Sequence, residues 1–103
     1  MQVQIQYFDG CPNWSVTEER LREALRVVGD SSALEHCPVE TQEDAKRLRF
    51  KGSPSILLNG QDLFQSETEN YGLTCRVYPT PDGPRGSPTL RQLIDAVSAA
   101  RNS

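Results

Sequence analysis

Residues 2–14 read QVQIQYFDGCPNW, and this stretch decides the fold. From Val3 to Tyr7 every second residue is apolar or aromatic and glutamines stand between them, a period of two that predicts a β-strand with one apolar face. The pair Asp9-Gly10 then supplies the residues of a turn. Cys11 therefore follows a strand and its turn directly.

An amphipathic helix is predicted after this cysteine. Pro12 occupies what would be the first helical position, and Gly29 provides a stop. Ser15–Glu18 also matches a capping box, and a helix that began there would leave Cys11 in a loop. Because of the proline we favour the earlier start. One face of this helix would carry the apolar residues Trp14, Leu21, Ala24, Leu25 and Val28.

The middle of the chain predicts two short strands and a short helix between them. Residues 33–40 form a weak strand, and Pro38 places it at the edge of a sheet because proline cannot donate to a ladder. Thr41 is a helix-capping residue followed by acidic residues. The apolar run Ser55–Leu58 predicts the second strand, and the hairpin signal Asn59-Gly60 leads from it into residues 61–64.

The last third of the chain predicts one more strand and a final helix. Residues 65–71 are polar and predict a loop. The alternation over residues 73–78 predicts a strand with Cys75 on its apolar side. The Pro- and Gly-rich residues 79–88 predict a connecting loop, and Ser87-Pro88 predicts the start of the last helix. The expected order is strand, helix, strand, helix, two strands, helix, a mixed α/β arrangement.

Composition excludes several classes of protein. The chain has 103 residues, enough for one domain, and its net charge of -3 without a long basic block argues against nucleic-acid binding. No apolar stretch has the roughly 18 residues of a membrane span, and no secretory signal is recognisable at the N-terminus. Three cysteines cannot all pair within one chain, so we expect a reducing, cytoplasmic location. The oligomeric state is not predicted.

Cys11 is the strongest candidate for chemistry. A thiol at a helix N-terminus faces free backbone N–H groups and the positive end of the helix dipole, and both favour the thiolate, which is the reactive form. A second informative segment is Gly52–Ser55, where Pro54 stands immediately before a predicted strand and can adopt a cis peptide bond. These two segments are the basis of the functional hypothesis.

Three segments resemble a family of small bacterial thioredoxin-like proteins, variously labelled thioredoxin-family, alkylmercury-lyase-like or DF-family selenoprotein-like. The segments are Tyr7–Trp14, Phe50–Ser55 and Gly72–Tyr78. The resemblance covers nearly the whole chain and implies a single thioredoxin-like α/β domain over residues 1–103, with a four-stranded mixed sheet and three helices in the order βαβαββα. In that fold the first strand is central, so its glutamines would line a face that we expect the short second helix to cover thinly.

The resemblance also implies roles for individual residues. Cys11 takes the place of the attacking cysteine, and Pro54 takes that of the cis-proline packed beside it. The position three after Cys11, where a dithiol oxidoreductase has its second cysteine, is Trp14. An indole cannot resolve a mixed disulfide, so a redox cycle needs glutathione, another protein thiol, or Cys75 or Cys37 as the resolving partner.

We therefore expect a thiol-dependent redox protein in which a solitary Cys11 forms mixed disulfides with glutathione or a protein thiol, without a cofactor or a bound metal. An alternative is a non-enzymatic module that binds a thiol, a peptide or a soft metal species such as a mercurial in the same cleft. A third possibility is an interaction domain without chemistry. The expected catalytic residues are Cys11, Pro54 and Cys75, and the expected substrate-binding residues are Pro12, Trp14 and Ser53.

Four further polar residues have simpler explanations than catalysis. Cys75 alternates with apolar residues, which is the pattern of a packing cysteine. Asp9 belongs first to its turn, although it could move a proton for Cys11. Arg76 is expected to be solvated or ion-paired. Cys37, beside the single histidine, lies in the weak edge strand.

Overall fold

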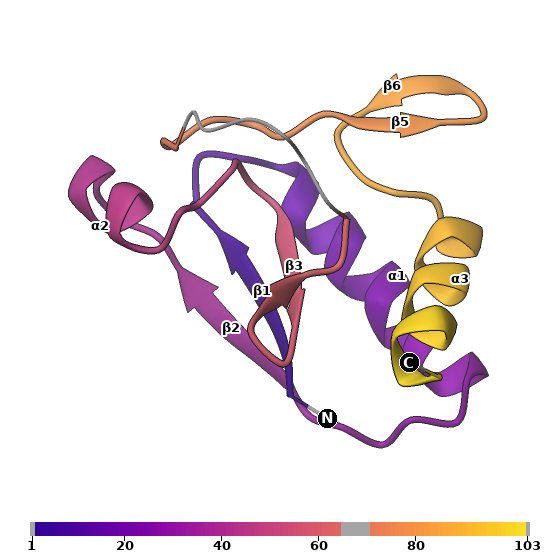
Figure 1. Ribbon diagram of the computed structural model, residues 1–103. Helices are drawn as coiled ribbons and strands as arrows, with labels where there is room; N and C mark the ends of the chain where they lie inside the picture. The colour runs from indigo at the N-terminus through magenta and orange to yellow at the C-terminus, as the bar shows by residue number, and fades with distance from the viewer. Residues whose placement is uncertain (1, 65–70, 103) are drawn as a thin grey trace.

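A computed structural model describes residues 2–64 and 71–102. Within these residues the fold is mixed α/β, with a four-stranded mixed sheet, a two-stranded sheet and three helices (Figure 1). The polar loop expected over residues 65–71 lies almost wholly outside the described residues. The elements are β1 (Val3–Tyr7), α1 (Asn13–Val27), β2 (Leu34–Pro38), α2 (Gln42–Arg47), β3 (Ser55–Leu58), β4 (Gln61–Asp62), β5 (Tyr78–Thr80), β6 (Gly83–Arg85) and α3 (Leu90–Arg101).

The larger sheet has the strand order β2-β1-β3-β4. β1 pairs parallel with β2 and antiparallel with β3, so Ile5 lies between His36 and Ile56. The parallel pair needs a crossover connection, which α1 provides. The prediction that the first strand is central is confirmed, and so is the edge position of the strand that contains Pro38.

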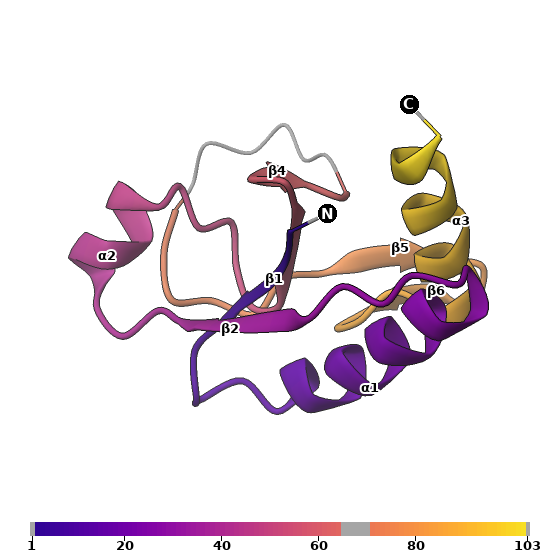
Figure 2. The same ribbon diagram turned by 90° about the horizontal axis from the view of Figure 1, so that it is seen from below.

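The main core lies where α1 and α3 meet the sheet. In Figure 2 both helices lie on the same side of the sheet, and α2 lies apart from them at the other end of β2. Apolar residues that recur along α1 every three or four positions supply one wall of this core. The fully or nearly buried members are Val3, Leu21, Ala24, Leu25, Ile56, Leu58, Leu93 and Val97.

A second, smaller core lies beside α2. Phe50 is completely buried there with Val39 and Ala45, and the partly buried Phe8 and Leu73 pack against this group. Phe8 belongs to the segment before Cys11, and Leu73 lies two residues before Cys75. The small core therefore supports both cysteine-bearing segments.

The prediction of a strand over residues 73–78 is wrong except at Tyr78, which begins β5. Among residues 73–77 only Cys75 makes a bridge, an isolated parallel one to Ser53. The predicted faces are also reversed, because Arg76 is 7% exposed while Val77 is 64% exposed. Arg76 is buried because Asp62 neutralises its charge and other acceptors satisfy its N–H groups, which the apolar alternation could not indicate.

The loop predicted over residues 79–88 contains a hairpin instead, so the element order differs from the expected βαβαββα. β5 and β6 pair with Pro79 opposite Pro84, and Gly83 has a φ of 98°. A two-stranded ribbon accepts proline because its outer edges need no ladder partner. The last helix also begins later than expected, because Thr89 and Gln92 form its capping box.

The glutamine residues of β1 do not form a uniformly wet face. Gln6 is buried, whereas the exposed Gln2 donates from Nε2 to Glu35 at 3.3 Å. Among the described residues no buried side-chain nitrogen or oxygen atom lacks a hydrogen-bond partner. Gln6 is therefore a buried residue of the central strand, unlike the solvent-facing Gln2.

Candidate functional site

The turn after β1 brings Cys11 to the start of α1. The backbone N–H of Cys11 donates to the carbonyl of Phe8 at 3.1 Å, which closes the turn. Pro12 is the N-cap of α1, with helical dihedral angles and no side-chain cap. The early helix start is confirmed, with Pro12 one position before the predicted one. The proline itself is exposed.

Cys11 and Cys75 lie side by side. The Cys11 residue has 0% exposure, and its Sγ donates to the Ser53 carbonyl at 3.4 Å. Cys75 is exposed, and its Sγ donates to the Sγ of Cys11 at 3.3 Å. Cys11 is therefore not solitary. The sulfur that solutes meet first is that of Cys75, so the alternation that is typical of a packing cysteine is misleading here.

Ser53 joins the two cysteine-bearing segments. Its carbonyl accepts from the N–H of Arg76 at 3.0 Å, and its own N–H donates to the carbonyl of Thr74 at 2.8 Å. Its Oγ accepts from the N–H of Phe8 at 3.3 Å. The Ser53–Pro54 peptide bond is cis, and both residues are buried. Ser53 and Pro54 thus lie beneath the thiol pair, where their backbone holds the segment of Cys75.

Gly52 allows this close approach of two segments. Its φ is 117°, and a Cβ at this position would lie 3.0 Å from the Cβ of Arg76 and 3.1 Å from the Arg76 backbone. Both the dihedral angle and the contact disfavour any side chain. The segment of Cys75 can reach Ser53 only because residue 52 is glycine.

Replacing Gly52 with alanine is expected to lower the free energy of unfolding by about 2 kcal/mol, since it strains the backbone and pushes against Arg76. Urea unfolding measures the change. Gly29→Ala is the matched control, because Gly29 also has a positive φ, 77°, but no atom lies within 4 Å of the place that a Cβ would take there. Equal losses in the two variants would show that the contact with Arg76 contributes nothing.

The pKa of Cys75 is raised above its ordinary value. The hydrogen bond to Cys11 is the largest cause, and burial and the charge of Cys11 add to it. The thiol of Cys75 therefore keeps its proton at neutral pH. Its thiolate, the nucleophilic form, becomes more abundant as the pH rises.

Arg76 anchors the segment that carries Cys75. Its Nη1 donates to Asp62 at 2.7 Å and to the Oγ of Ser55 at 3.2 Å, and its Nη2 donates to the carbonyl of Phe64. The guanidinium group also lies over the ring of Tyr78, 4.8 Å from the centroid. Of the two expectations for Arg76, ion pairing is confirmed and solvation is wrong, whereas the other contacts of this network have no local signal in the sequence.

Tyr78 holds the segment of Pro54 in place through a hydrogen bond. Its hydroxyl donates to the carbonyl of Pro54, and burial holds the pKa of Tyr78 well above its usual range. The phenol therefore stays a neutral hydrogen-bond donor. Tyr78 stands at the start of β5, so this bond ties the hairpin to the cis-proline segment.

Trp14, at the start of α1, packs against residues of β1 and β2. Its ring stacks on Tyr7 with centroids 4.3 Å apart and an interplanar angle of 20°. His36 meets both rings edge-on and contacts Glu18 at 2.6 Å. The Trp14 side chain therefore packs against the sheet, as its place on the apolar face of the helix indicates. Burial would raise the pKa of Glu18, but its bonds to Arg22 and His36 hold that pKa below the usual value.

Within the described residues, neither Cys37 nor Asp9 makes a hydrogen bond to the sulfur of Cys11 or Cys75. Cys37 is half-buried in β2, and burial raises its pKa, opposed in part by Arg47. Asp9 is exposed in the turn before Cys11. Among residues 2–64 and 71–102, no group of three or more His, Cys, Asp or Glu residues could hold a metal ion.

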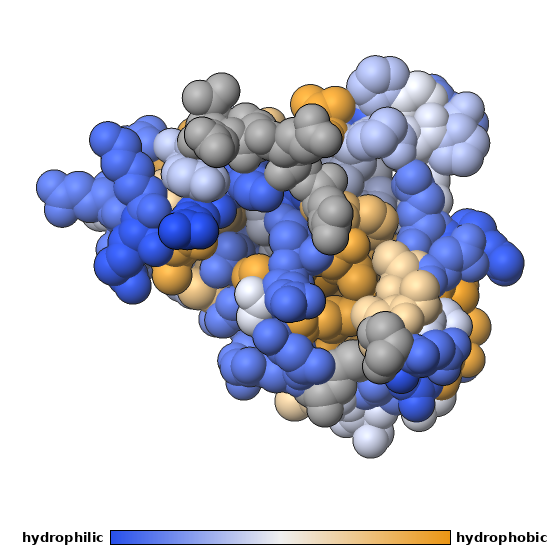
Figure 3. All heavy atoms as spheres, viewed as in Figure 1, coloured by the Kyte–Doolittle hydropathy of each residue, from blue (hydrophilic) through white to orange (hydrophobic). Residues whose placement is uncertain are grey.

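An apolar hollow of about 350 Å³ lies elsewhere on the molecule, between β4 and α3. Figure 3 shows apolar surface in this region, and Leu58, Leu63 and Ala96 are among its lining residues. The thiol pair lies at the opposite ends of the strands, so the hollow is not part of the site.

Comparison of the chain with protein-family models, with curated proteins and with solved structures gave no match. Among the described residues, no helix has the length and apolar character needed to cross a bilayer.

Proposed function

We propose that this chain is a thiol redox protein in which Cys11 and Cys75 form a reversible disulfide on a thioredoxin-like framework. The observation that carries the proposal is the 3.3 Å separation of the two sulfur atoms. Two thiols in contact, one of them exposed, can exchange with an external disulfide and then close on each other.

Three features support the thioredoxin-like framework. A strand, a crossover helix and a parallel strand open the fold, and an antiparallel strand follows on the other side of β1. Cys11 lies at the junction of β1 and α1. A cis-proline precedes β3 and lies beside that cysteine, because Ser53 accepts the Cys11 thiol. The β5–β6 hairpin is a departure from the expected pattern.

The proposed reaction is thiol–disulfide exchange with an external disulfide, either glutathione disulfide or a protein disulfide. The thiolate of Cys75 attacks one sulfur, which forms a mixed disulfide and releases the first external thiol. Cys11 then attacks the Cys75 sulfur, which forms the internal disulfide and releases the second. Two protein thiols are oxidised and one external disulfide is reduced to two thiols, so electrons and protons balance. The reverse sequence reduces the protein.

The division of roles follows from exposure. Cys75 is exposed and can meet the substrate, whereas Cys11 is buried and can reach only its neighbour. This assignment reverses the one that the resemblance implied. Because the pKa of Cys75 is raised, exchange is slow at neutral pH and accelerates as the pH rises toward that pKa.

The test is to oxidise the reduced protein with 2-hydroxyethyl disulfide, alkylate the remaining thiols and map the peptides by mass spectrometry. We expect a crosslink between Cys11 and Cys75, with Cys37 alkylated. Cys37→Ser is the matched control and should give the same crosslink, because Cys37 lies outside the pair. Cys75→Ser should give none.

Persistent free thiols at both Cys11 and Cys75 would contradict the proposal. A second candidate function is the binding of a soft metal species by the two sulfurs, favoured by the convergence of two thiols, one of them exposed. Stoichiometric binding of a mercurial by a protein that forms no crosslink would favour this candidate.

A further inference from the structure

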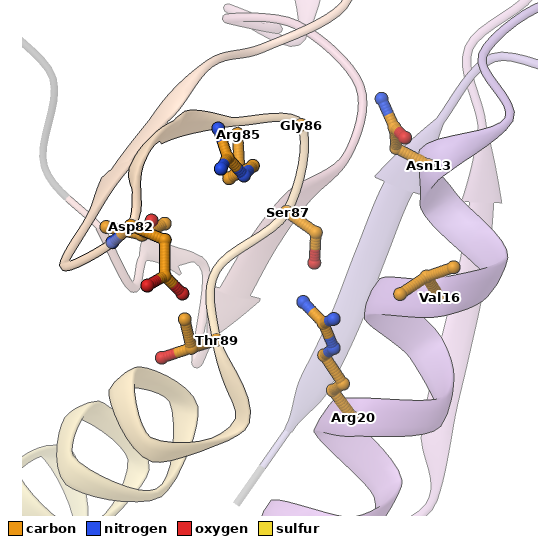
Figure 4. Close-up of a pocket in the computed structure, with 9 residues that line it drawn as sticks. Asn13, Val16, Arg20, Asp82, Arg85, Gly86, Ser87 and Thr89 are labelled. Carbon is orange, nitrogen blue, oxygen red and sulfur yellow. Dashed lines mark hydrogen bonds between the residues drawn. The ribbon is translucent and has the colours of Figure 1, made fainter.

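A cleft of about 240 Å³ lies between the first half of α1 and the β5–β6 hairpin. Figure 4 shows Asn13, Val16 and Arg20 extending from α1 toward the segment that carries Arg85 and Ser87. Gly86 lies so close to α1 that a Cβ there would be 2.1 Å from the Nδ2 of Asn13. The cleft therefore lies where these two elements meet, and most of its lining residues are polar or charged.

The charges in this cleft are mainly positive. Arg20 donates to the carbonyl of Pro88 at 2.8 Å, and Arg85 donates to the carbonyl of Pro84 at 2.9 Å, so each guanidinium group keeps further N–H groups for a ligand. Asp82 is the acidic residue of the lining. Two guanidinium groups and one carboxylate leave a net positive charge.

A second hollow, of about 300 Å³, lies between the turn after β1 and the segment after β2. Phe8, Val39 and Leu73 give it an apolar lining, and Asp9 and Glu40 give it two carboxylates. A long basic side chain suits such a place, because its aliphatic stem covers apolar surface while its head reaches a carboxylate.

Four charged side chains that line these hollows have no ion-pair partner in the part of the chain that the structure describes. Among residues 2–64 and 71–102, Asp9, Glu40, Arg20 and Arg85 belong to none of the ion pairs. Charged side chains at a hollow that no internal partner neutralises are available to a ligand.

Each of the two hollows has a lining residue close to Cys11 in the sequence. Gly10 lines the acidic hollow and is the neighbour of Cys11, and Asn13 lines the basic cleft two residues beyond Cys11. Consecutive Cα atoms are about 3.8 Å apart, so both lining residues have their Cα within about 8 Å of that of Cys11. Cys75, in contact with Cys11, is therefore near both the acidic hollow and the basic cleft.

We propose that the substrate of the thiol pair is an extended peptide segment whose cysteine is flanked by a basic residue on one side and an acidic residue on the other. The inference rests on the proposed function. The basic side chain enters the hollow of Asp9 and Glu40, the acidic one enters the cleft of Arg20 and Arg85, and the cysteine sulfur meets Cys75. A small neutral disulfide reaches the same sulfur but leaves both hollows empty.

The test uses five peptides of equal length, each with one central cysteine activated as a 2-pyridyl disulfide. The flanking pairs are Lys and Glu in both orders, two Lys, two Glu and two Gln. Reduced protein attacks the peptide sulfur, and the released thiopyridone gives the second-order rate constant. We expect one of the two bipolar peptides, selected by chain direction, to react about fivefold faster than the Gln peptide, because two solvent-facing ion pairs form. Both like-charged peptides should react more slowly than that peptide.

Arg85→Gln and Glu40→Gln should each reduce the fivefold preference to below about twofold. Arg91→Gln is the matched control, because Arg91 is exposed on α3 and pairs with Asp95. The proposal is overturned if the five rates are equal, or if they follow peptide net charge alone, with the two-Lys peptide fastest on this protein of charge -3. Failure of the proposed function is distinguishable, because then neither a peptide nor 2-hydroxyethyl disulfide would oxidise the pair.

Discussion

Replacing Arg76 with methionine is expected to lower the free energy of unfolding by about 3 kcal/mol, because the change leaves Asp62 without its charged partner. Arg76 is 7% exposed at its side chain and Asp62 is 19% exposed, so solvent replaces the lost interaction poorly. The Oγ of Ser55 and the carbonyl of Phe64 lose the same donor. The variant also loses the contact of the guanidinium group with Tyr78.

Urea unfolding followed by circular dichroism measures this change. The surface pair of Arg91 and Asp95 is the control, and Arg91→Gln should cost less than about 1 kcal/mol because both side chains are exposed. The double variant Arg76→Met with Asp62→Leu removes both charges and should recover part of the loss. A loss in Arg76→Met no larger than in Arg91→Gln would show that the buried pair does not stabilise the fold.

Arg76→Met also has a functional consequence under the proposed function. Arg76 is a positioning residue, because its backbone bonds to Ser53 and its side chain holds the segment of Cys75. Oxidation of the pair by 2-hydroxyethyl disulfide should therefore slow, while alkylation of Cys75 alone should not. Unchanged oxidation with reduced stability would give Arg76 a structural role only.

The start of the fold could be predicted because its signals are local. The alternation from Val3 to Tyr7 gave β1, and the apolar stripe after Pro12 gave α1. Thr41 was identified as a cap, and its side chain accepts from the N–H of Asp44. Pro38 correctly predicted an edge strand, because a residue without a backbone N–H cannot donate to a neighbouring strand in any fold.

The thiol pair could not be predicted in the same way, because it depends on contacts between distant segments. The alternation around Cys75 predicted a buried thiol. In the structure Arg76 is buried instead, and Cys75 is exposed. The cause is Asp62, fourteen residues earlier, which makes an arginine the inward residue. The hairpin was missed because its prolines, which disfavour strands in general, lie opposite each other in a ribbon with two open edges.

The small core around Phe50 is expected both to stabilise the fold and to hold the two thiols in position. Phe50→Ala is expected to lower the free energy of unfolding by about 3–5 kcal/mol, because it removes a fully buried aromatic side chain and leaves a cavity. Phe50 packs with Val39 and Ala45, and Phe8 and Leu73 lie against them. Its carbonyl also accepts from the N–H of Gly72 at 3.2 Å. The segments of both cysteines should therefore loosen.

Urea unfolding gives the stability, and the rate of crosslinking between Cys11 and Cys75 gives the functional effect. Leu93→Ala is the matched control, because Leu93 is equally buried in the main core, away from the cysteine-bearing segments. It should cost a similar free energy, about 2–5 kcal/mol, without slowing the crosslink in the folded protein. Phe50→Leu, expected to cost about 1 kcal/mol, keeps the comparison possible if the alanine variant does not fold. Equal crosslinking rates in the Phe50 and Leu93 variants would mean that the small core does not position the thiols, and that Ser53 and Arg76 do so alone.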